Sequence, residues 1–357
     1  MSSQGERASW IDLSLVPGLG PRSYRELLGA FGLPDKILSA SLAQLSRVVP
    51  GAIAGKILED GRETRIAAAL EWIEQPGRTL VTLADPEYPQ QLFQIPDPPV
   101  VLYIIGDPRL LGAASLAIVG SRNCTQQGLT NAERFARALS EAGLVIVSGL
   151  ALGIDAAAHR GGLAGTSSTV AVLGCGANIV YPPANQKLFA QITETGAIVS
   201  EFPLGTPPAR ANFPRRNRLI SGLSRGCLVV EAAVASGSLI TARFASEQGR
   251  EVFAIPGSIH SPLSKGCHAL IKQGAKLVES AQDVLEELGL SSRSPFIHNS
   301  SGVTNGLLQH MGYDPCTIDI LVHRAGLTAE AISAMLLTLE LEGKVSSLPG
   351  GVYQRIS

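Results

Sequence analysis

Short apolar runs recur along the middle of the chain, with amphipathic segments between several of them. The apolar runs lie at 100–106, 115–120, 144–149, 169–174, 197–202, 227–232, 252–257 and 275–280. The helix-like segments lie at 129–143, 184–196, 238–249 and 266–274. Continuous apolar strands that alternate with helices are typical of a parallel sheet covered on both faces. The pattern therefore predicts an α/β fold with right-handed crossovers for residues 76–290.

The first part of the chain, residues 1–75, has a different pattern and reads as a domain of short helices. A Val-Pro-Gly-Leu-Gly turn at 16–20 separates two apolar helical stretches. A similar but less complete sequence, which also contains Val-Pro-Gly, follows at 47–58. In a helix-hairpin-helix unit such a turn offers backbone N–H groups to a DNA phosphate. The second sequence, 47–58, lacks the paired glycines, so a helical domain that does not touch DNA is an equal alternative.

The last part of the chain predicts a separate small domain. Residues 291–305 are rich in Ser, Asn and Gly and are predicted to be a linker. Residues 316–355 give a helix, a turn, a longer helix and a strand pair closed by Pro-Gly-Gly, which is the order of a winged helix. We therefore expect a winged-helix-like domain at 306–357. Its expected recognition helix, 329–343, has three Glu and no Lys or Arg, which favours protein contact over a DNA groove.

Composition narrows the class of protein. The five cysteines are 40 or more residues apart, without a CxxC pair, which disfavours a zinc knuckle or a disulfide framework. The sequence MSSQGERASW lacks the basic and apolar regions of a signal peptide, and prolines break the long uncharged stretch at 161–186. We expect a soluble, cytoplasmic protein with reduced thiols and no membrane partner.

Positive charge is concentrated in one segment, although the net charge of the whole chain is only −1. A loop predicted at 200–222 brings most of this charge. Residues 202–230 contain no Asp or Glu but five arginines: Arg210, Arg215, Arg216, Arg218 and Arg225. Guanidinium groups next to glycines and Asn217 suit an oxyanion, above all phosphate. The alternative is a solvated loop with scattered arginines.

Ligands of open α/β sheets bind beyond the carboxyl ends of the strands, so the loops there are the candidate site. Gly120, Ser121 and Arg122 follow one strand and offer close backbone approach, a hydroxyl group and a guanidinium. Gly149 and Gly153 precede a helix whose first turn can point N–H groups at an anion. Asn185 and Lys187 open another helix, and Ser236, Gly237 and Ser238 open a third.

Catalytic chemistry is not indicated by these loops. There is no G-x-G-x-x-G or Walker A sequence, so no nucleotide cofactor is expected, and no metal site or catalytic residue is predicted. Asp155 and His159 are four residues apart and could form an acid–base pair, but a structural hydrogen bond or helix cap is the simpler interpretation. Glu201 and Glu231 end strands and are expected to orient the arginines.

A set of motifs carries a family resemblance. They are IVGSR (118–122), SGLALGIDAAAH (148–159), TVAVLGCG (169–176), YPPANQKL (181–188), SEFPLGTPP (200–208), FPRRNRLISGLS (213–224), VVEAAVASGSLITARFASEQGREVFAIPG (229–257) and HALIKQGA (268–275). Together they resemble the bacterial DNA-processing protein A family (DprA, also called Smf) over roughly 80–290. The flanking units also fit, because many members carry an N-terminal helical SAM-like domain and a C-terminal winged helix.

The resemblance implies an extended Rossmann-like, mostly parallel sheet that binds single-stranded DNA. Such proteins protect incoming DNA in natural transformation, load the RecA recombinase onto it and displace single-strand-binding protein. They act as homodimers and are not known as enzymes. We therefore expect the same of this chain.

The resemblance also implies site residues. Gly120, Ser121 and Arg122 match the family's G-S-R, and Lys187 matches the basic residue after its Tyr-Pro turn. In the family's F-P-x-R-N-R, Arg215 fills the variable position. The expected DNA-binding residues are Gly120, Ser121, Arg122, Gly149, Asn185, Lys187, Phe213, Arg215, Arg216, Asn217, Arg218, Gly237 and Ser238.

Some alternatives stay open at this point. Phe213 or Tyr181 could stack on a base or belong to the core. A nucleotide-phosphate-processing enzyme on a related Rossmann-like fold would use the same anion loops, with Glu201 or Glu231 as its base. A recombination scaffold that works by protein contact is a third reading.

Overall fold

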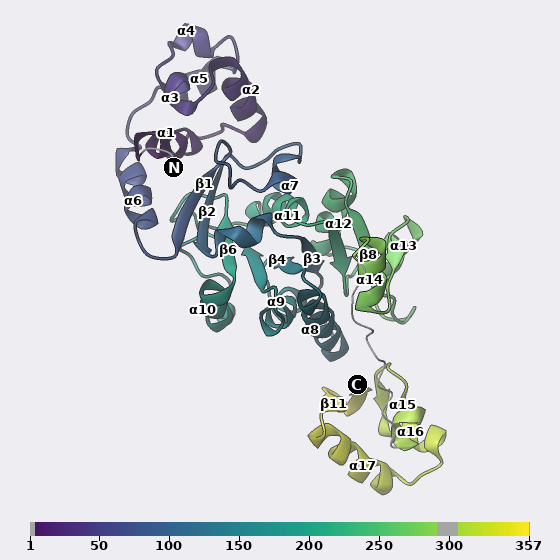
Figure 1. Ribbon diagram of the computed structural model, residues 1–357. Helices are drawn as coiled ribbons and strands as arrows, with labels where there is room; N and C mark the ends of the chain where they lie inside the picture. The colour runs from purple at the N-terminus through teal and green to yellow at the C-terminus, as the bar shows by residue number, and fades with distance from the viewer. Residues whose placement is uncertain (1–3, 291–305, 357) are drawn as a thin grey trace.

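The central domain is built on one nine-stranded sheet (Figure 1). The computed structural model describes residues 4–290 and 306–356; the predicted linker lies outside these residues. The strand order is β1-β2-β6-β5-β4-β3-β7-β8-β9. The strands are β1 (Arg78–Thr82), β2 (Val101–Gly106), β3 (Ser115–Val119), β4 (Val145–Ser148), β5 (Thr169–Val172), β6 (Ala197–Ser200), β7 (Gly226–Val229), β8 (Glu251–Ala254) and β9 (Lys276–Leu277).

The predicted mostly parallel, Rossmann-like sheet is confirmed, with an antiparallel extension at one end. Strands β6, β5, β4, β3, β7, β8 and β9 pair in parallel. Strand β2 pairs antiparallel with both β1 and β6. The sequence pattern identified β2 but missed β1, whose run Arg-Thr-Leu-Val-Thr has only two strongly apolar residues.

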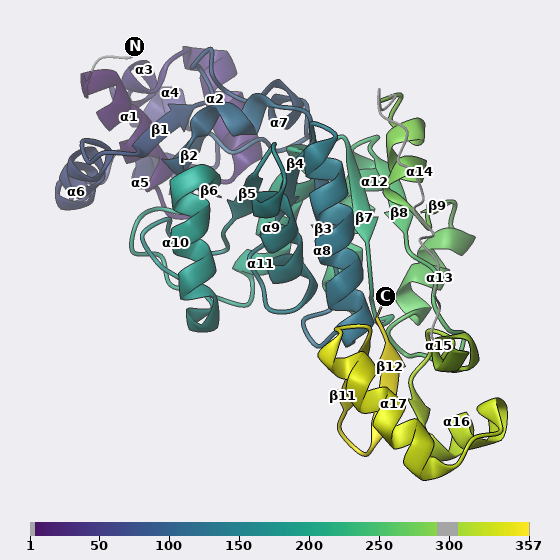
Figure 2. The same cartoon turned by 60° about the horizontal axis from the view of Figure 1, so that its bottom comes forward.

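Helices cover both faces of the sheet, as the apolar runs required. The connecting helices are α7 (Gln90–Phe93), α8 (Gln126–Glu141), α9 (Ile154–Ala164), α10 (Gln186–Thr195), α11 (Asn212–Gly222), α12 (Ser238–Glu247), α13 (Lys265–Lys272) and α14 (Ala281–Glu287), with short 3-10 turns at Pro108–Gly112 and Pro183–Asn185. Leu116 and Ile118 of β3 pack with α8, α9 and α14, whereas Ala117 and Val119 pack on the opposite side with α11 and α12. Figure 2 shows α8 and α9 side by side on the first of these faces. Successive side chains of one strand thus fill two separate cores.

The strand order creates a crevice between β3 and β7. From β3 the chain continues through β4, β5 and β6 in one direction, and from β7 through β8 and β9 in the other. The helix that follows β3 and the helix that follows β7 pack on opposite faces. The loops beyond these two strands therefore diverge, which is where open α/β sheets bind ligands.

The N-terminal part is helical, as predicted, and its core continues into the sheet. Its helices are α1 (Gln4–Ser14), α2 (Pro21–Phe31), α3 (Pro34–Leu38), α4 (Leu42–Leu45), α5 (Gly51–Ile57) and α6 (Glu63–Ile73). Trp72 of α6 meets Tyr103 of β2 edge-on, with ring centroids 5.9 Å apart. Leu80 and Val101 join the same apolar cluster. The helices therefore cover the antiparallel end of the sheet.

The C-terminal part has the predicted winged-helix order. It comprises α15 (Gly306–Met311), β10 (Cys316–Thr317), α16 (Ile318–Ala325), α17 (Ala329–Leu341), β11 (Val345–Leu348) and β12 (Val352–Arg355). Helix α16 ends at Gly326, whose φ of +66° is left-handed and favours glycine. Its apolar cluster contains only residues from 307 to 353. In the described residues no single helix is long and apolar enough to cross a membrane; α16 and α17 reach that length only together, bent by 108°.

Candidate nucleic-acid interface

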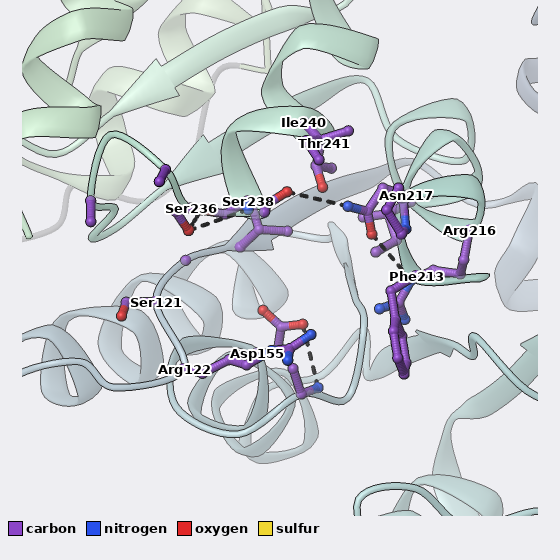
Figure 3. A pocket seen from close by; sticks show the side chains of 18 of the residues that line it. Ser121, Arg122, Asp155, Phe213, Arg216, Asn217, Ser236, Ser238, Ile240 and Thr241 are labelled. Atoms are coloured by element: carbon purple, nitrogen blue, oxygen red, sulfur yellow. Dashed lines mark hydrogen bonds between the residues drawn. The ribbon is translucent and has the colours of Figure 1, made fainter. Parts of the chain in front are cut away.

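A cavity of about 810 Å³ opens at the crevice between β3 and β7 (Figure 3). Its walls come from the loops after β3, β4, β5, β6 and β7 and from helices α9, α11 and α12. Three arginines and one acidic residue line it: Arg122, Arg210, Arg216 and Asp155. The lining therefore has a formal charge of +2, which suits an anion.

The loop after β3 is held by Glu231. The Ser121 N–H donates to the Glu231 carbonyl oxygen at 2.7 Å. The Glu231 carboxylate accepts from the Thr125 N–H at 2.9 Å and from the Thr125 hydroxyl at 2.5 Å. Gly120 is required because a Cβ there would lie 2.6 Å from Ile154 and 2.9 Å from the Glu231 oxygen. Glu231 thus fixes this loop, and the expectation that it orients an arginine is wrong.

The loop after β4 is held by two polar side chains of α9. Asp155 Oδ2 accepts from the N–H groups of Gly149 at 3.1 Å and Ala151 at 3.4 Å. His159 Nε2 accepts from the Leu150 N–H at 3.2 Å. Asp155 and His159 bind neighbouring backbone groups rather than each other, so their role is to shape the loop.

His159 is neutral in this arrangement. The Thr169 hydroxyl donates to the Ile146 carbonyl oxygen at 2.6 Å, so its oxygen accepts from His159 Nδ1–H at 2.7 Å. Both ring nitrogens are then satisfied by the uncharged imidazole. Burial and the nearby Arg216 lower the pKa of His159 to about 3.

The arginine-rich segment after β6 is a helix and not the predicted loop. Residues Asn212–Gly222 form α11, because Leu219 and Ile220, with Leu223 just beyond, bury one side of it against the sheet. The helical form fixes where each arginine points, and neighbouring positions face directions about 100° apart.

Arg216 lies inside the molecule at the edge of the cavity. Its guanidinium donates to the carbonyl oxygens of Gly149, at 2.8 Å, and Val172. A Cβ on Gly149 would lie 2.6 Å from that guanidinium. Burial lowers the pKa of Arg216 to about 10, so it stays charged at neutral pH. Burial raises the pKa of the neighbouring Asp155, and the charge of Arg216 opposes that rise.

Asn217 connects α11 to the beginning of α12, where two serines bond to each other. Asn217 Nδ2 donates to the Gly237 carbonyl oxygen at 3.3 Å. Ser236 Oγ accepts from the Ser238 N–H at 3.3 Å, and the two hydroxyl groups lie 2.7 Å apart. Figure 3 shows these side chains on the wall opposite Asp155.

Aromatic rings and Arg122 form one side of the cavity. Phe213 stacks on Tyr181 with centroids 5.7 Å apart and an angle of 29° between the rings. The Arg122 guanidinium lies 5.6 Å from the centre of the Phe213 ring. Arg122 is exposed and lines the cavity, and it forms no ion pair with a carboxylate of residues 4–290 or 306–356, so its charge is open to the cavity.

Comparison with known proteins identifies the family. The family model described as DNA recombination-mediator protein A matches residues 79–289, more than half of the chain. The chain belongs to this family. The DprA winged helix domain matches residues 292–351, which agrees with the C-terminal fold.

Relatives of this DprA-family chain cover most of its length. Protein Smf of Escherichia coli (strain K12) is 44% identical over 82% of this chain and 81% of its own. The X-ray structure of DprA from Streptococcus pneumoniae is similar with a TM-score of 0.69 and 39% identity, over 78% of this chain and 97% of that one. A structure on the single-stranded DNA binding mode of DprA from Helicobacter pylori is similar with a TM-score of 0.53 and 31% identity, over 59% of this chain and 95% of that one.

Eight of the thirteen expected site residues line the cavity of this DprA-family chain. They are Gly120, Ser121, Arg122, Phe213, Arg216, Asn217, Gly237 and Ser238. They come from the loops after β3 and β7 and from helices α11 and α12, spread over more than a hundred residues, and the crevice between β3 and β7 brings them together.

Five expected site residues lie elsewhere. Gly149 is covered by Arg216, and buried Asn185 donates from Nδ2 to the Leu150 carbonyl oxygen at 2.9 Å, so both support the loop after β4. Lys187 is exposed at the start of α10, outside the cavity lining.

The remaining two, Arg215 and Arg218, share the carboxylate of Glu201. Arg218 is only 3% exposed and also pairs with Asp97, with 3.0 Å between Nε and Oδ2. The prediction that the Arg218 guanidinium is open to a phosphate is wrong, because positions 215 and 218 share a face of α11 that turns away from the cavity. Glu201 orients these two arginines, as expected.

Several residues that line the cavity are not among the predicted site residues, for example Arg210, Asn123 and Thr241. Arg210 had a signal, since it lies in the acid-free stretch 202–230. Asn123 and Thr241 had none, because their place depends on the loops and helices that meet at the crevice.

Proposed function

We propose that this chain binds single-stranded DNA in the cavity between β3 and β7. The proposal rests on one observation: three arginines and a single buried carboxylate line a cavity of about 810 Å³. A relative of known structure from Helicobacter pylori binds single-stranded DNA, which supports the same ligand here.

The exposed arginines, Arg122 and Arg210, are the proposed phosphate contacts. Arg216 already donates to two carbonyl oxygens, and its buried guanidinium adds positive charge at the edge of the cavity. Phe213 and Tyr181 offer ring surface on which a base can stack. Lys187 stays a proposed contact outside the cavity, at the beginning of α10. Binding that depends on the backbone of the strand tolerates any sequence and weakens with salt.

The wider role follows from the family. We propose that the chain protects incoming single strands in natural transformation, loads the RecA recombinase and displaces single-strand-binding protein. We further propose that it acts in the cytoplasm as a homodimer. The description of the family as recombination mediators and the names of its relatives as DNA-processing proteins support this role.

The protein-level proposals have direct tests. A pull-down from DNA-free extract with RecA as bait should retain the chain, and light scattering should give twice the mass of one chain. Retention that occurs only when DNA is added back to the extract would show a DNA bridge instead of protein contact.

One titration tests the DNA proposal. Fluorescent oligo-dT and a duplex of equal length are titrated at about 50 and 200 mM salt. We expect tighter binding of oligo-dT and a clear loss of affinity at the higher salt. Equal affinity for both DNAs, or no binding, would contradict the proposal.

The enzyme alternative has less support. The carboxylate of Glu201 pairs with two arginines and that of Glu231 with Thr125, so neither is free to act as a base. Among residues 4–290 and 306–356, no group of three or more His, Cys, Asp or Glu side chains is placed to hold a metal ion. We propose a binding protein without turnover; release of phosphate or nucleoside from mononucleotides, with or without magnesium, would contradict it.

A further inference from the structure

Four large apolar side chains are exposed on the loops after β4, β5, β7 and β8, and one of them, Tyr181, lines the cavity. Leu152 is 44% exposed, Tyr181 39%, Val234 67% and Ile259 67%. Single exposed hydrophobic residues are common on protein surfaces. Between β1 and α14, however, the structure exposes only six large hydrophobic residues, and four of them lie on these loops; the other two are Phe93 and Leu277.

The sheet places the four loops on two sides of β3, where the cavity opens. Tyr181 and Leu152 follow β5 and β4, whereas Val234 and Ile259 follow β7 and β8. Since these strands are parallel, all four loops lie at the same edge, and β3 with Arg122 is between the two pairs. Four strand spacings from β5 to β8 are roughly 19 Å. This is about the length of six stacked nucleotides.

Hydrogen bonds hold the loops that carry Val234 and Ile259. The Ala232 N–H donates to the Leu263 carbonyl oxygen at 2.7 Å, and the Ala232 oxygen accepts from the Gly266 N–H at 2.7 Å. The Ser261 N–H donates to the Ser258 oxygen at 3.1 Å. The two loops are therefore connected, and both side chains are presented to solvent from a fixed backbone.

The composition of the loop after β7 is unusual for a solvated surface. Residues 232–237 are Ala, Ala, Val, Ala, Ser and Gly, with no charged side chain. An apolar surface beside exposed arginines matches a ligand that is anionic along one side and apolar along the other. A single strand whose bases are unpaired has this character, because each base offers an apolar face next to a phosphate.

We propose that Val234 and Ile259, with Leu152 and Tyr181 on the other side, contact the faces of unpaired bases and thereby select single strands over duplexes. The inference rests on the proposed function of the cavity. In a duplex the base faces are stacked on each other, and the outside of the helix is sugar and phosphate. The four side chains would then lose water without gaining an apolar contact.

The test combines Val234→Ser with Ile259→Ser and uses three ligands. They are oligo-dT, an abasic strand of equal length and the duplex. We expect the double variant to bind oligo-dT about tenfold more weakly and the abasic strand within about twofold of the parent protein, with an unchanged salt slope. Leu42→Ser is the control, because Leu42 is 51% exposed on the helical domain. It should leave every affinity unchanged.

The outcomes separate this inference from the proposed function. Unchanged oligo-dT affinity in the double variant, or an equal loss on the abasic strand, would overturn the base contact while DNA binding itself stands. Failure of the parent protein to bind either single strand would overturn the proposed function. A matching thermal unfolding midpoint shows that the variants are folded. Leu152→Ser repeats the test on the other side of the cavity, where we expect a smaller loss of the same kind.

Discussion

The three arginines of the cavity differ in what they can still bind. Arg216 is buried and donates to backbone oxygens of the loop after β4 and of β5. Arg122 and Arg210 are exposed on the cavity wall. The first therefore shapes the site, and the other two are the residues that a phosphate can reach.

Replacing Arg122 with Ala should weaken the binding of all single strands alike. The loss of one phosphate contact should reduce the slope of log K against log salt by about 0.7. Arg137→Ala is the matched control, since Arg137 is an exposed arginine that pairs with Glu141 near the far end of α8. An unchanged affinity and slope in the Arg122 variant would remove this residue from the interface.

His159 predicts a dependence of stability on pH. Its pKa is about 3 in the folded protein, below its ordinary value of 6.5, so between these values the unfolded chain binds more protons. The free energy of unfolding should therefore fall as the pH falls below 6.5, by up to about 1.4 kcal/mol per pH unit. Urea unfolding between pH 7 and 5.5 measures this, and His159→Gln should flatten the dependence. An equal slope in the variant would assign the effect to other groups.

At the scale of elements, α11 has two functional faces. One face carries Arg216 and Asn217 to the cavity, and the other carries Arg215 and Arg218 to Glu201. The periodicity of the helix thus directs one of its three arginines to the edge of the cavity and the other two to Glu201.

Replacing Arg218 with Ala should destabilise the fold much more than Arg215→Ala. The side chains of Arg218 and Glu201 are both buried, and the loss of Arg218 leaves the buried carboxylate with only the half-exposed Arg215 as its charged partner, at a cost of about 3 kcal/mol. Arg215 pairs with the same carboxylate but is 51% exposed, so its loss should cost less than about 1 kcal/mol. Chemical denaturation compares the two variants, and equal effects would contradict the assigned roles.

Two glycines beside the cavity predict opposite outcomes on substitution by Ala. Gly153 has a φ of +76°, and a Cβ there would lie 2.4 Å from the Ser121 oxygen. The change should cost at least about 2 kcal/mol and weaken DNA binding, because it displaces the loop after β3. Gly237 has a φ of −63° and no atom within 4 Å of a Cβ, so Gly237→Ala should change stability by less than about 0.5 kcal/mol. A well-tolerated Gly153→Ala would contradict the close packing of the two loops.

At the scale of the whole molecule, the two flanking parts relate differently to the sheet. The N-terminal helices share one apolar cluster with β1 and β2, including Leu80, Val101 and Tyr103. The winged helix has an apolar cluster of its own. The predicted boundary at 75/76 falls between α6 and β1, but the core crosses it.

Deletion of the two parts should therefore have different consequences. Removal of residues 1–73 uncovers Leu80, Val101 and Tyr103 and should lower both the unfolding midpoint and the soluble yield. Removal of residues 306–357 should leave the midpoint of the remaining chain and its affinity for single strands nearly unchanged. Thermal unfolding and the oligo-dT titration measure both. A stable, soluble 74–357 fragment would show that the sheet does not depend on the helices.

The sequence by itself determined the parallel sheet and most of its edge. Apolar strands that alternate with helices form a parallel sheet covered on both faces. The carboxyl ends of its strands lie at one edge, which places Gly120, Ser121, Arg122, Gly237 and Ser238 there. The winged-helix order was equally local, because turns and helix caps are encoded by neighbouring residues. These features can be predicted because each is encoded by residues that lie close together in the sequence.

Only the tertiary structure decided which arginines face the cavity. The partners of Arg218 are Glu201 and Asp97, 17 and 121 positions earlier in the chain. The pairing of β1 with β2 and the place of Arg210 likewise depend on contacts between distant segments. A charge pattern shows how many guanidinium groups lie in a segment. Which of them are buried with a carboxylate depends on the phase of α11 against the sheet, and packing sets that phase.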